Sequence, residues 1–166
     1  MFIEQEDFLT DYECDCLIDI FHKESVRVEK YDCTNILYFD SILLYQGDDY
    51  IKDILKSIRS KIEYHIKQFD FNAFSNYMQI VEWPVDSFQN LHYDFNYHCY
   101  TSIIYLNHTY DGGNTQVNDK LILPKKGKII TFNGNETIHG VIPVTKGVRY
   151  TVPVWYKRLG NLRNNS

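Results

Sequence analysis

The second half of the chain places the strongest constraint on the fold, because short apolar segments alternate there with turn-forming residues. β-Branched and aromatic side chains fit the pleated surface of a sheet, whereas Gly, Asn and Asp favour turns. Several short strands separated in this way predict a β-sandwich or a jelly roll. The expected strands are 77–83, 99–106, 128–132, 137–141 and 148–156.

Pro153 lies inside the last of these segments. A proline has no backbone N–H, so it cannot donate a hydrogen bond to a neighbouring strand. We therefore expect segment 148–156 either to lie at the edge of a sheet or to contain a bulge at Pro153.

The first half of the chain carries helical patterns instead. Thr10 and Glu13 have the spacing of a capping box, and apolar residues recur after them at helical intervals, which predicts a helix over 11–23. An apolar stripe opposite lysines and arginines predicts a second helix over 49–69. Two short apolar segments between the helices are expected to form strands: 36–38 and 42–45.

The bulk composition is that of a globular protein. A length of 166 residues fits one domain, with 44% hydrophobic and 23% charged residues. We expect a single domain over 1–166, with a helical support region over 1–75 and a jelly-roll core over 76–157. The net charge of −5 gives no general attraction to nucleic acid or to anionic membranes.

Neither a membrane nor an export pathway is expected from the sequence. No apolar run reaches the length of a membrane span, and the acidic N-terminus lacks the basic start and apolar stretch of a signal peptide. We therefore expect a cytoplasmic protein. The cysteines show no regular disulfide framework and are expected to be reduced thiols: Cys14, Cys16, Cys33 and Cys99.

Two metal-binding side chains, His92 and Asp94, are separated by one residue. In a β-strand the positions i and i+2 point to the same face, so both side chains would project together from one strand end. His139 lies in a later strand-like segment and could complete a triangle. Two histidines and one carboxylate, with the remaining positions open, form the metal site of non-haem Fe(II) oxygenases.

Arg149 follows His139, and its planar guanidinium suits a carboxylate ligand.

Each of these residues also fits a plainer role when taken alone. A His-x-Asp pair occurs by chance in many proteins, and a lone histidine is most often structural or exposed. For Arg149 the plainer alternative is a surface arginine or one that pairs with an acidic residue. The joint order of the residues is what favours a metal site. Of the remaining histidines, His22 and His65 fall on expected helices, and His98 and His108 could be neighbours of the ligands or unrelated to them.

The order of short motifs resembles the 2-oxoglutarate/Fe(II)-dependent dioxygenases, and specifically their prolyl 4-hydroxylase-like branch. The resemblance covers roughly 11–156, and 8–14 is similar to the start of that branch. It implies an α+β, mainly β fold: a double-stranded β-helix (a cupin-like jelly roll) with N-terminal helices packed on one sheet. The matching pieces are Leu91-His92-Tyr93-Asp94, Tyr105-Leu106-Asn107, Gly112-Gly113-Asn114-Thr115, Lys126-Gly127-Lys128, His139-Gly140-Val141, Gly147-Val148-Arg149-Tyr150 and Val154-Trp155-Tyr156.

Carried over by motif, the resemblance implies that the catalytic iron is held by His92, Asp94 and His139. It also implies that Arg149 pairs with the distal carboxylate of 2-oxoglutarate and that the hydroxyl of Tyr105 assists it. A core aromatic is the alternative for Tyr105.

The resemblance also bears on the two tryptophans. Trp83 stands near the place where this branch often has a tyrosine that contacts the co-substrate, although an indole offers a single donor and no acceptor. Trp155 would line the substrate side, and a core position is its alternative.

The activity implied by the resemblance is hydroxylation coupled to decarboxylation of 2-oxoglutarate, with Fe(II) and O2 and with ascorbate as the reductant. The retained Asp94 favours hydroxylation over halogenation. The implied substrate is a prolyl residue in a peptide or protein, bound in a groove formed by loop 94–100 and segment 36–45. Two alternatives remain open: the same chemistry on a free amino acid or other small molecule, and a jelly-roll binding module that holds a metal without catalysis. The sequence does not predict the oligomeric state.

Overall fold

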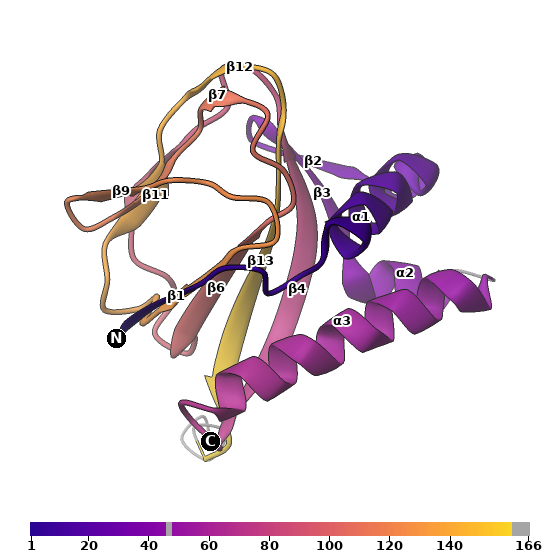
Figure 1. Ribbon diagram of the computed structural model, residues 1–166. Coiled ribbons are helices and arrows are strands. Elements are labelled where there is room, and N and C mark those ends of the chain that lie inside the picture. Colours follow the sequence, from indigo (N-terminus) through magenta and orange to yellow (C-terminus); the bar gives the residue numbers. More distant parts are fainter. Residues whose placement is uncertain (46–47, 161–166) are drawn as a thin grey trace.

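The computed structural model describes residues 1–45 and 48–160, and its helices lie together on one side of the long strands (Figure 1). The helices are α1 (Asp11–Lys23), α2 (Phe39–Tyr45) and α3 (Asp49–Lys67), with a 3-10 turn at Ser25–Arg27. None of the helices in these described ranges combines the length and the apolar character needed to cross a membrane.

A large antiparallel sheet forms the centre of the molecule. Within the described residues it has seven strands in the order β1-β10-β6-β13-β4-β3-β2. Their bounds are Phe2–Gln5 for β1, Ile129–Phe132 for β10, Tyr100–Tyr105 for β6, Arg149–Arg158 for β13, Ala73–Trp83 for β4, Thr34–Tyr38 for β3 and Glu29–Tyr31 for β2.

A smaller sheet faces the large one from the side opposite to the helices (Figure 1). Its strand order is β5-β11-β8-β9, and a separate two-stranded ribbon joins β12 to β7. Two antiparallel sheets facing each other, with helices outside the larger one, confirm the predicted jelly-roll fold. The bounds are Gln89–His92 for β5, His139–Val141 for β11, Thr115–Val117 for β8, Lys120–Ile122 for β9, Val144–Lys146 for β12 and Asp111–Gly112 for β7.

Alternation along the long strands separates the core from the interior of the jelly roll. In β13, Val152 and Val154 pack in the core with the helices, whereas Thr151 and Trp155 line a cavity on the other face. Successive side chains of a strand point to opposite faces, so a single strand serves both surfaces. The apolar stripes of α1 and α3 close the helix side of the sheet. Their buried members are Cys14, Leu17, Ile20, Phe21, Ile51, Leu55, Ile58, Ile62 and Ile66.

The N-terminal helix begins as predicted. The Thr10 hydroxyl accepts a hydrogen bond from the Glu13 backbone N–H (3.1 Å), and the Glu13 carboxylate accepts one from the Thr10 backbone N–H (2.9 Å). Lys61 of α3 also reaches this carboxylate (2.7 Å) and ties the two helices together. The longer helix ends at Lys67, two residues before the predicted end, because the chain then tightens: the backbone N–H groups of Gln68 and Phe69 donate to the carbonyls three residues earlier.

Segment 42–45 is part of helix α2, so its prediction as a strand is wrong. Ile42 is fully buried, together with Phe39 three residues earlier, while Leu44 is 75% exposed. A strand would place Ile42 and Leu44 on one face, whereas helical spacing buries the first and exposes the second. Segment 36–38 does form a strand, inside β3.

The expected edge position of the last strand is also wrong, because β13 lies between β4 and β6 in the middle of the sheet. Pro153 stays paired with Ile103 of β6, and the pairing with β4 passes from Thr151 directly to Val154. Pro153 thus lies where the pairing with β4 is interrupted, so no hydrogen bond to β4 is lost through its missing N–H. The register shifts between Trp155 and Tyr156, two residues beyond Pro153.

The single-domain assignment stays a prediction. Residues 1–75 contribute more than helical support, since β1, β2 and β3 join the large sheet and β4 begins at Ala73. The predicted boundary between 75 and 76 therefore falls inside a strand. Residues 161–166 of the predicted domain lie outside the described residues.

Candidate metal and co-substrate site

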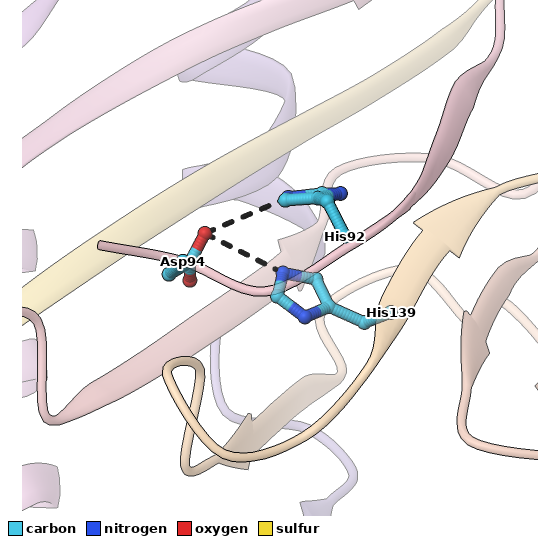
Figure 2. Close-up of side chains that lie close together, drawn as sticks. All are labelled: His92, Asp94 and His139. Atoms are coloured by element: carbon cyan, nitrogen blue, oxygen red, sulfur yellow. Dashed lines mark ion pairs between the residues drawn. The ribbon is translucent and has the colours of Figure 1, made fainter. Parts of the chain in front are cut away.

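The three predicted metal ligands meet at the end of the small sheet (Figure 2). His92 ends β5 and lies directly across from His139, which begins β11. The Nε2 atoms of both imidazoles are 3.6 Å from Oδ1 of Asp94. The three potential ligand atoms lie within 4.8 Å of one another, so the sequence spacing and one cross-strand pair together create a compact donor set.

Backbone carbonyls fix the orientation of both imidazoles. His92 Nδ1 lies 2.9 Å from the Asn90 carbonyl oxygen, and His139 Nδ1 lies 2.8 Å from that of Thr137. A carbonyl only accepts, so each Nδ1 carries a proton and donates it. In the neutral ring Nε2 then has the free lone pair, whereas in the protonated ring of the metal-free site the Nε2–H faces Asp94. An anchored Nδ1–H and an inward-facing Nε2 are typical of histidines that ligate a metal.

The Asp94 carboxylate is held by residues that the sequence analysis did not identify. Thr101, which is 1% exposed, donates a hydrogen bond from its hydroxyl to Asp94 Oδ2, and the Asp94 backbone N–H donates to the Gly134 carbonyl (3.0 Å). A Cβ at Gly134 would collide with both the Asp94 carboxylate and the Thr101 hydroxyl. The glycine therefore permits the close approach that brings Asp94 into the site. Thr101 is seven residues from Asp94 in the sequence, whereas Gly134 is far from it, and no motif marks either residue.

The charge state of the free site follows from these contacts. Burial opposes ionisation of Asp94, but hydrogen bonds from His139, His92 and Thr101 outweigh it and hold the pKa of the carboxyl well below its usual range. The hydrogen bond with Asp94 raises the pKa of His92, against the opposing effect of burial. The site thus presents a carboxylate and two anchored imidazoles, the donor types that suit Fe(II).

Arg149 lies at the start of β13, is only 1% exposed, and forms no ion pair with an acidic side chain in residues 1–45 and 48–160. Its Nη2 donates to the Thr115 hydroxyl (3.1 Å), while Nε and Nη1 are buried without a hydrogen-bond partner among the described residues. A buried cation is costly unless an anion pairs with it. The arrangement therefore fits an anion that comes from outside the chain.

Tyr105 and Thr115 extend the surroundings of this arginine. Tyr105 is fully buried, donates its hydroxyl hydrogen to the Thr115 hydroxyl (2.8 Å), and has its pKa raised by burial. Its ring lies 5.9 Å from Cζ of Arg149. Thr115 lines the cavity and joins both residues, whereas the sequence analysis marked it only as part of a Gly-Gly turn motif.

Trp83 also lies beside Arg149, with its ring 4.6 Å from Cζ. Its indole Nε1–H donates to the Thr151 hydroxyl at 3.1 Å. An indole has a single donor, so the predicted contact of this N–H with a co-substrate is already replaced by a contact inside the protein.

The ligand triad and Arg149 line a common cavity of about 400 Å³. Trp155 is among its walls, stacked on Tyr77 with 4.7 Å between the ring centroids. The predicted groove of loop 94–100 and segment 36–45 is confirmed only in part. Ile36 and Tyr38 of β3 line the cavity, as do residues of the loop after Asp94. Among the described residues, none of helix α2 lines it. The aromatic members of the wall are Tyr31, Tyr38, Tyr77, Trp83, Tyr93, Phe95, His98 and Trp155.

The other histidines occupy varied positions. His65 is buried and bonds the Thr131 hydroxyl, and His22 bonds the Tyr150 hydroxyl. His108 accepts from the Lys126 backbone N–H, and His98 lines the cavity beside the ligand set. None of them belongs to the metal-binding cluster found among the described residues.

The family follows from a comparison with known proteins. The model of the 2OG-Fe(II) oxygenase superfamily matches residues 75–157, half of the chain, and the protein belongs to this superfamily. Among curated relatives, prolyl 3-hydroxylase 2 of Mus musculus and of Homo sapiens are each 34% identical over 70 residues. That match covers 37% of this chain and 10% of either relative, so the chain spans about a tenth of their length.

Solved structures show the same fold over nearly the whole chain. The viral collagen prolyl hydroxylase of Paramecium Bursaria Chlorella virus-1, in a 2-oxoglutarate complex, has a TM-score of 0.71 at 21% identity and covers 95% of this chain and 96% of its own. A prolyl-4-hydroxylase of Pseudomonas putida also has a TM-score of 0.71, at 18% identity, with 96% and 93% covered. The superfamily implies Fe(II), 2-oxoglutarate and O2, and both the donor set and the unpaired Arg149 nitrogens fit these groups.

Proposed function

We propose that the protein is an Fe(II)- and 2-oxoglutarate-dependent dioxygenase that hydroxylates a prolyl residue in a peptide or protein and releases succinate and CO2. One observation carries the proposal. The anchored triad of His92, Asp94 and His139 lines the same cavity as Arg149, which is buried and has no acidic partner among the described residues. A metal site and a carboxylate site within one cavity fit a co-substrate that needs both.

Each residue has a defined task in this proposal. His92 and His139 present Nε2, and Asp94 presents Oδ1, as the ligands that would hold Fe(II) on one face. Arg149 would bind the distal carboxylate of 2-oxoglutarate, with Thr115 and Tyr105 holding the guanidinium in place. When bound, Fe(II) and 2-oxoglutarate supply the oxidising chemistry, in which 2-oxoglutarate loses CO2 and O2 provides the hydroxyl oxygen.

The cavity wall supports a prolyl substrate. Tyr77 and Trp155 offer stacked aromatic faces, and Phe95 is 67% exposed at the mouth. Aromatic-lined grooves suit proline-rich segments, whose extended conformation costs little entropy to order. The structural relatives agree with this chemistry, since they include a collagen prolyl hydroxylase and a prolyl hydroxylase bound to a hypoxia inducible factor peptide from Trichoplax adhaerens.

Two finer parts of the proposal concern the setting of the reaction. We propose ascorbate as the reductant that keeps the iron ferrous between turnovers. We also propose a reducing, cytoplasmic location, which the four free cysteines of the structure support. The carbon that is hydroxylated is left to experiment, because the curated relatives are prolyl 3-hydroxylases and a structural neighbour is a prolyl-4-hydroxylase.

The test is succinate formation by the purified protein with Fe(II), ascorbate and 2-oxoglutarate, with proline-rich peptides added. Mass spectrometry of the peptides should show one added oxygen on proline, and comparison with 3- and 4-hydroxyproline standards identifies the carbon. The matched control is the same peptide with alanine in place of the modified proline. Oxidation of free proline or another small molecule, with every peptide left unmodified, would reject the peptidyl substrate. Absence of 2-oxoglutarate binding would reject the oxygenase.

A further inference from the structure

Trp83 and Arg149 form a buried cross-strand pair in the wall of the cavity. The two residues are directly opposite in the β4–β13 ladder, and the guanidinium Cζ lies 4.6 Å from the indole ring. We propose that Trp83 is a positioning residue for Arg149, whose guanidinium it holds through its ring face ready for the distal carboxylate. This inference rests on the proposed function, because it takes 2-oxoglutarate as the anion that Arg149 binds.

The charge balance of the pocket gives the ring a clear task. Arg149 is 1% exposed and has no acidic partner among the described residues, while Nε and Nη1 make no hydrogen bond there. An aromatic face attracts a guanidinium through its quadrupole, most strongly where water is excluded. Trp83, itself only 8% exposed, therefore stabilises a buried cation until the carboxylate arrives.

Positioning also reduces the entropy cost of binding. An arginine side chain has many rotamers, and a ligand that must immobilise it loses affinity. Here the indole holds one face of the guanidinium, the Thr115 hydroxyl holds Nη2, and the Tyr105 ring lies 5.9 Å from Cζ. The guanidinium is thus already ordered, and its unpaired nitrogens remain available.

The indole N–H has a separate partner and is not part of this role. Nε1 donates to Thr151, whose side chain is on the cavity face of β13 and 1% exposed. The positioning of the Arg149 guanidinium is therefore assigned to the face of the indole ring. Phenylalanine keeps an aromatic face, so it should replace Trp83 better than leucine does.

The experiment measures binding of 2-oxoglutarate by calorimetry, with Mn(II) as a redox-inert metal, to the wild type and to the Trp83→Leu and Trp83→Phe variants. We expect Trp83→Leu to weaken binding about 3- to 10-fold, because the ligand must then pay the entropy cost of ordering one arginine side chain. Trp83→Phe should remain within about twofold of the wild type. Trp155→Leu is the matched control for loss of an indole in the same cavity, and its affinity for 2-oxoglutarate should stay within about twofold.

A second ligand separates positioning from a general structural role. 2-Oxobutyrate keeps the metal-chelating oxoacid but has no distal carboxylate, so its binding should be equal in the wild type and Trp83→Leu. Equal losses for both oxoacids, or a Trp83→Phe variant as weak as Trp83→Leu, would overturn the proposal. A Trp83→Leu variant that binds 2-oxoglutarate as the wild type does would also overturn it.

The chain has two tryptophans, which allows a test that keeps Trp83 and does not depend on the folding of Trp83→Leu. In a Trp155→Phe protein, Trp83 is the sole indole, and its fluorescence should change with 2-oxoglutarate and not with 2-oxobutyrate. Identical responses to the two oxoacids, or none, would contradict the pairing. These measurements use no peptide. The role of Trp83 can therefore be confirmed even if the prolyl substrate is rejected, and it can be rejected even if the prolyl substrate is confirmed.

Discussion

The two ends of the cavity differ in how completely the protein satisfies its own polar groups. At the metal end, both imidazole Nδ1 atoms are bonded to carbonyls and Asp94 accepts from Thr101. At the other end, Arg149 is buried with two nitrogens unpartnered and no acid beside it within the described residues. The side chains at the metal end orient the metal ligands, whereas the guanidinium at the arginine end has nitrogens that can bind an anion, and the two ends should therefore respond to separate substitutions.

The largest expected effect comes from removing the carboxylate at the metal end. Asp94→Ala leaves two imidazoles without the anionic ligand. Loss of a hydrogen bond that only supports a ligand lowers metal affinity by up to about 100-fold, so loss of the ligand itself should lower it further and abolish turnover. Metal binding is measured by calorimetry with Mn(II), and turnover by succinate formation. Turnover like that of the wild type in this variant would contradict the ligand assignment.

The arginine end should give the next largest effect, and it should leave metal binding alone. Arg149→Gln removes the cation that the distal carboxylate needs, so 2-oxoglutarate binding should weaken by about 2–5 kcal/mol. Mn(II) affinity measured without the oxoacid should be unchanged. If the variant kept the co-substrate affinity of the wild type, Arg149 would have no part in the site.

Two threonines offer a matched pair that distinguishes the ends directly. Thr101→Val keeps the side-chain shape but removes the hydrogen bond to Asp94, so metal affinity should fall about 10- to 100-fold. Thr115→Val removes the hydroxyl that joins Arg149 and Tyr105, so it should weaken 2-oxoglutarate binding and leave the metal in place. Titrations of each variant with Mn(II) and then with 2-oxoglutarate measure both effects. A crossed result, in which Thr115→Val releases the metal, would break the comparison.

The smallest expected effect is a difference in pH dependence. Only a neutral imidazole binds a metal, and the hydrogen bond with Asp94 raises the pKa of the metal-free His92. Metal affinity should therefore be constant at high pH and fall as the pH is lowered through that pKa, by up to about tenfold per pH unit for one displaced proton. An arginine stays charged throughout, so the preference for 2-oxoglutarate over 2-oxobutyrate should not change with pH. Calorimetry at several pH values measures both quantities.

The sequence predicted the metal end better than the arginine end, for a physical reason. His92 and Asp94 are two residues apart at a strand end, so their spacing predicts that they lie together, and His139 was a candidate because it lies in a later strand-like segment. The supporting residues Thr101, Thr115 and Gly134 act through contacts that depend on how strands and turns pack in the folded chain, and no spacing rule reveals such contacts.

Errors in the predicted fold have the same origin. Segment 42–45 reads as a strand from composition, but burial of Ile42 and exposure of Leu44 follow from packing against the large sheet. Pro153 suggested either an edge strand or a bulge, yet neighbours on both sides enclose β13, and the shift in register falls between Trp155 and Tyr156. The local signals that do not depend on neighbours, such as the capping box at Thr10, were predicted correctly.

The most direct test of a shared Fe(II) and 2-oxoglutarate site is visible absorption under anaerobic conditions. A 2-oxoacid that chelates Fe(II) gives a charge-transfer band, so titration of the Fe(II) protein with 2-oxoglutarate should produce this band and saturate at one equivalent per chain. The Asp94→Ala variant should give none, and Arg149→Gln should need more 2-oxoglutarate to reach it. A wild-type protein that binds Fe(II) and 2-oxoglutarate without this band would contradict the account.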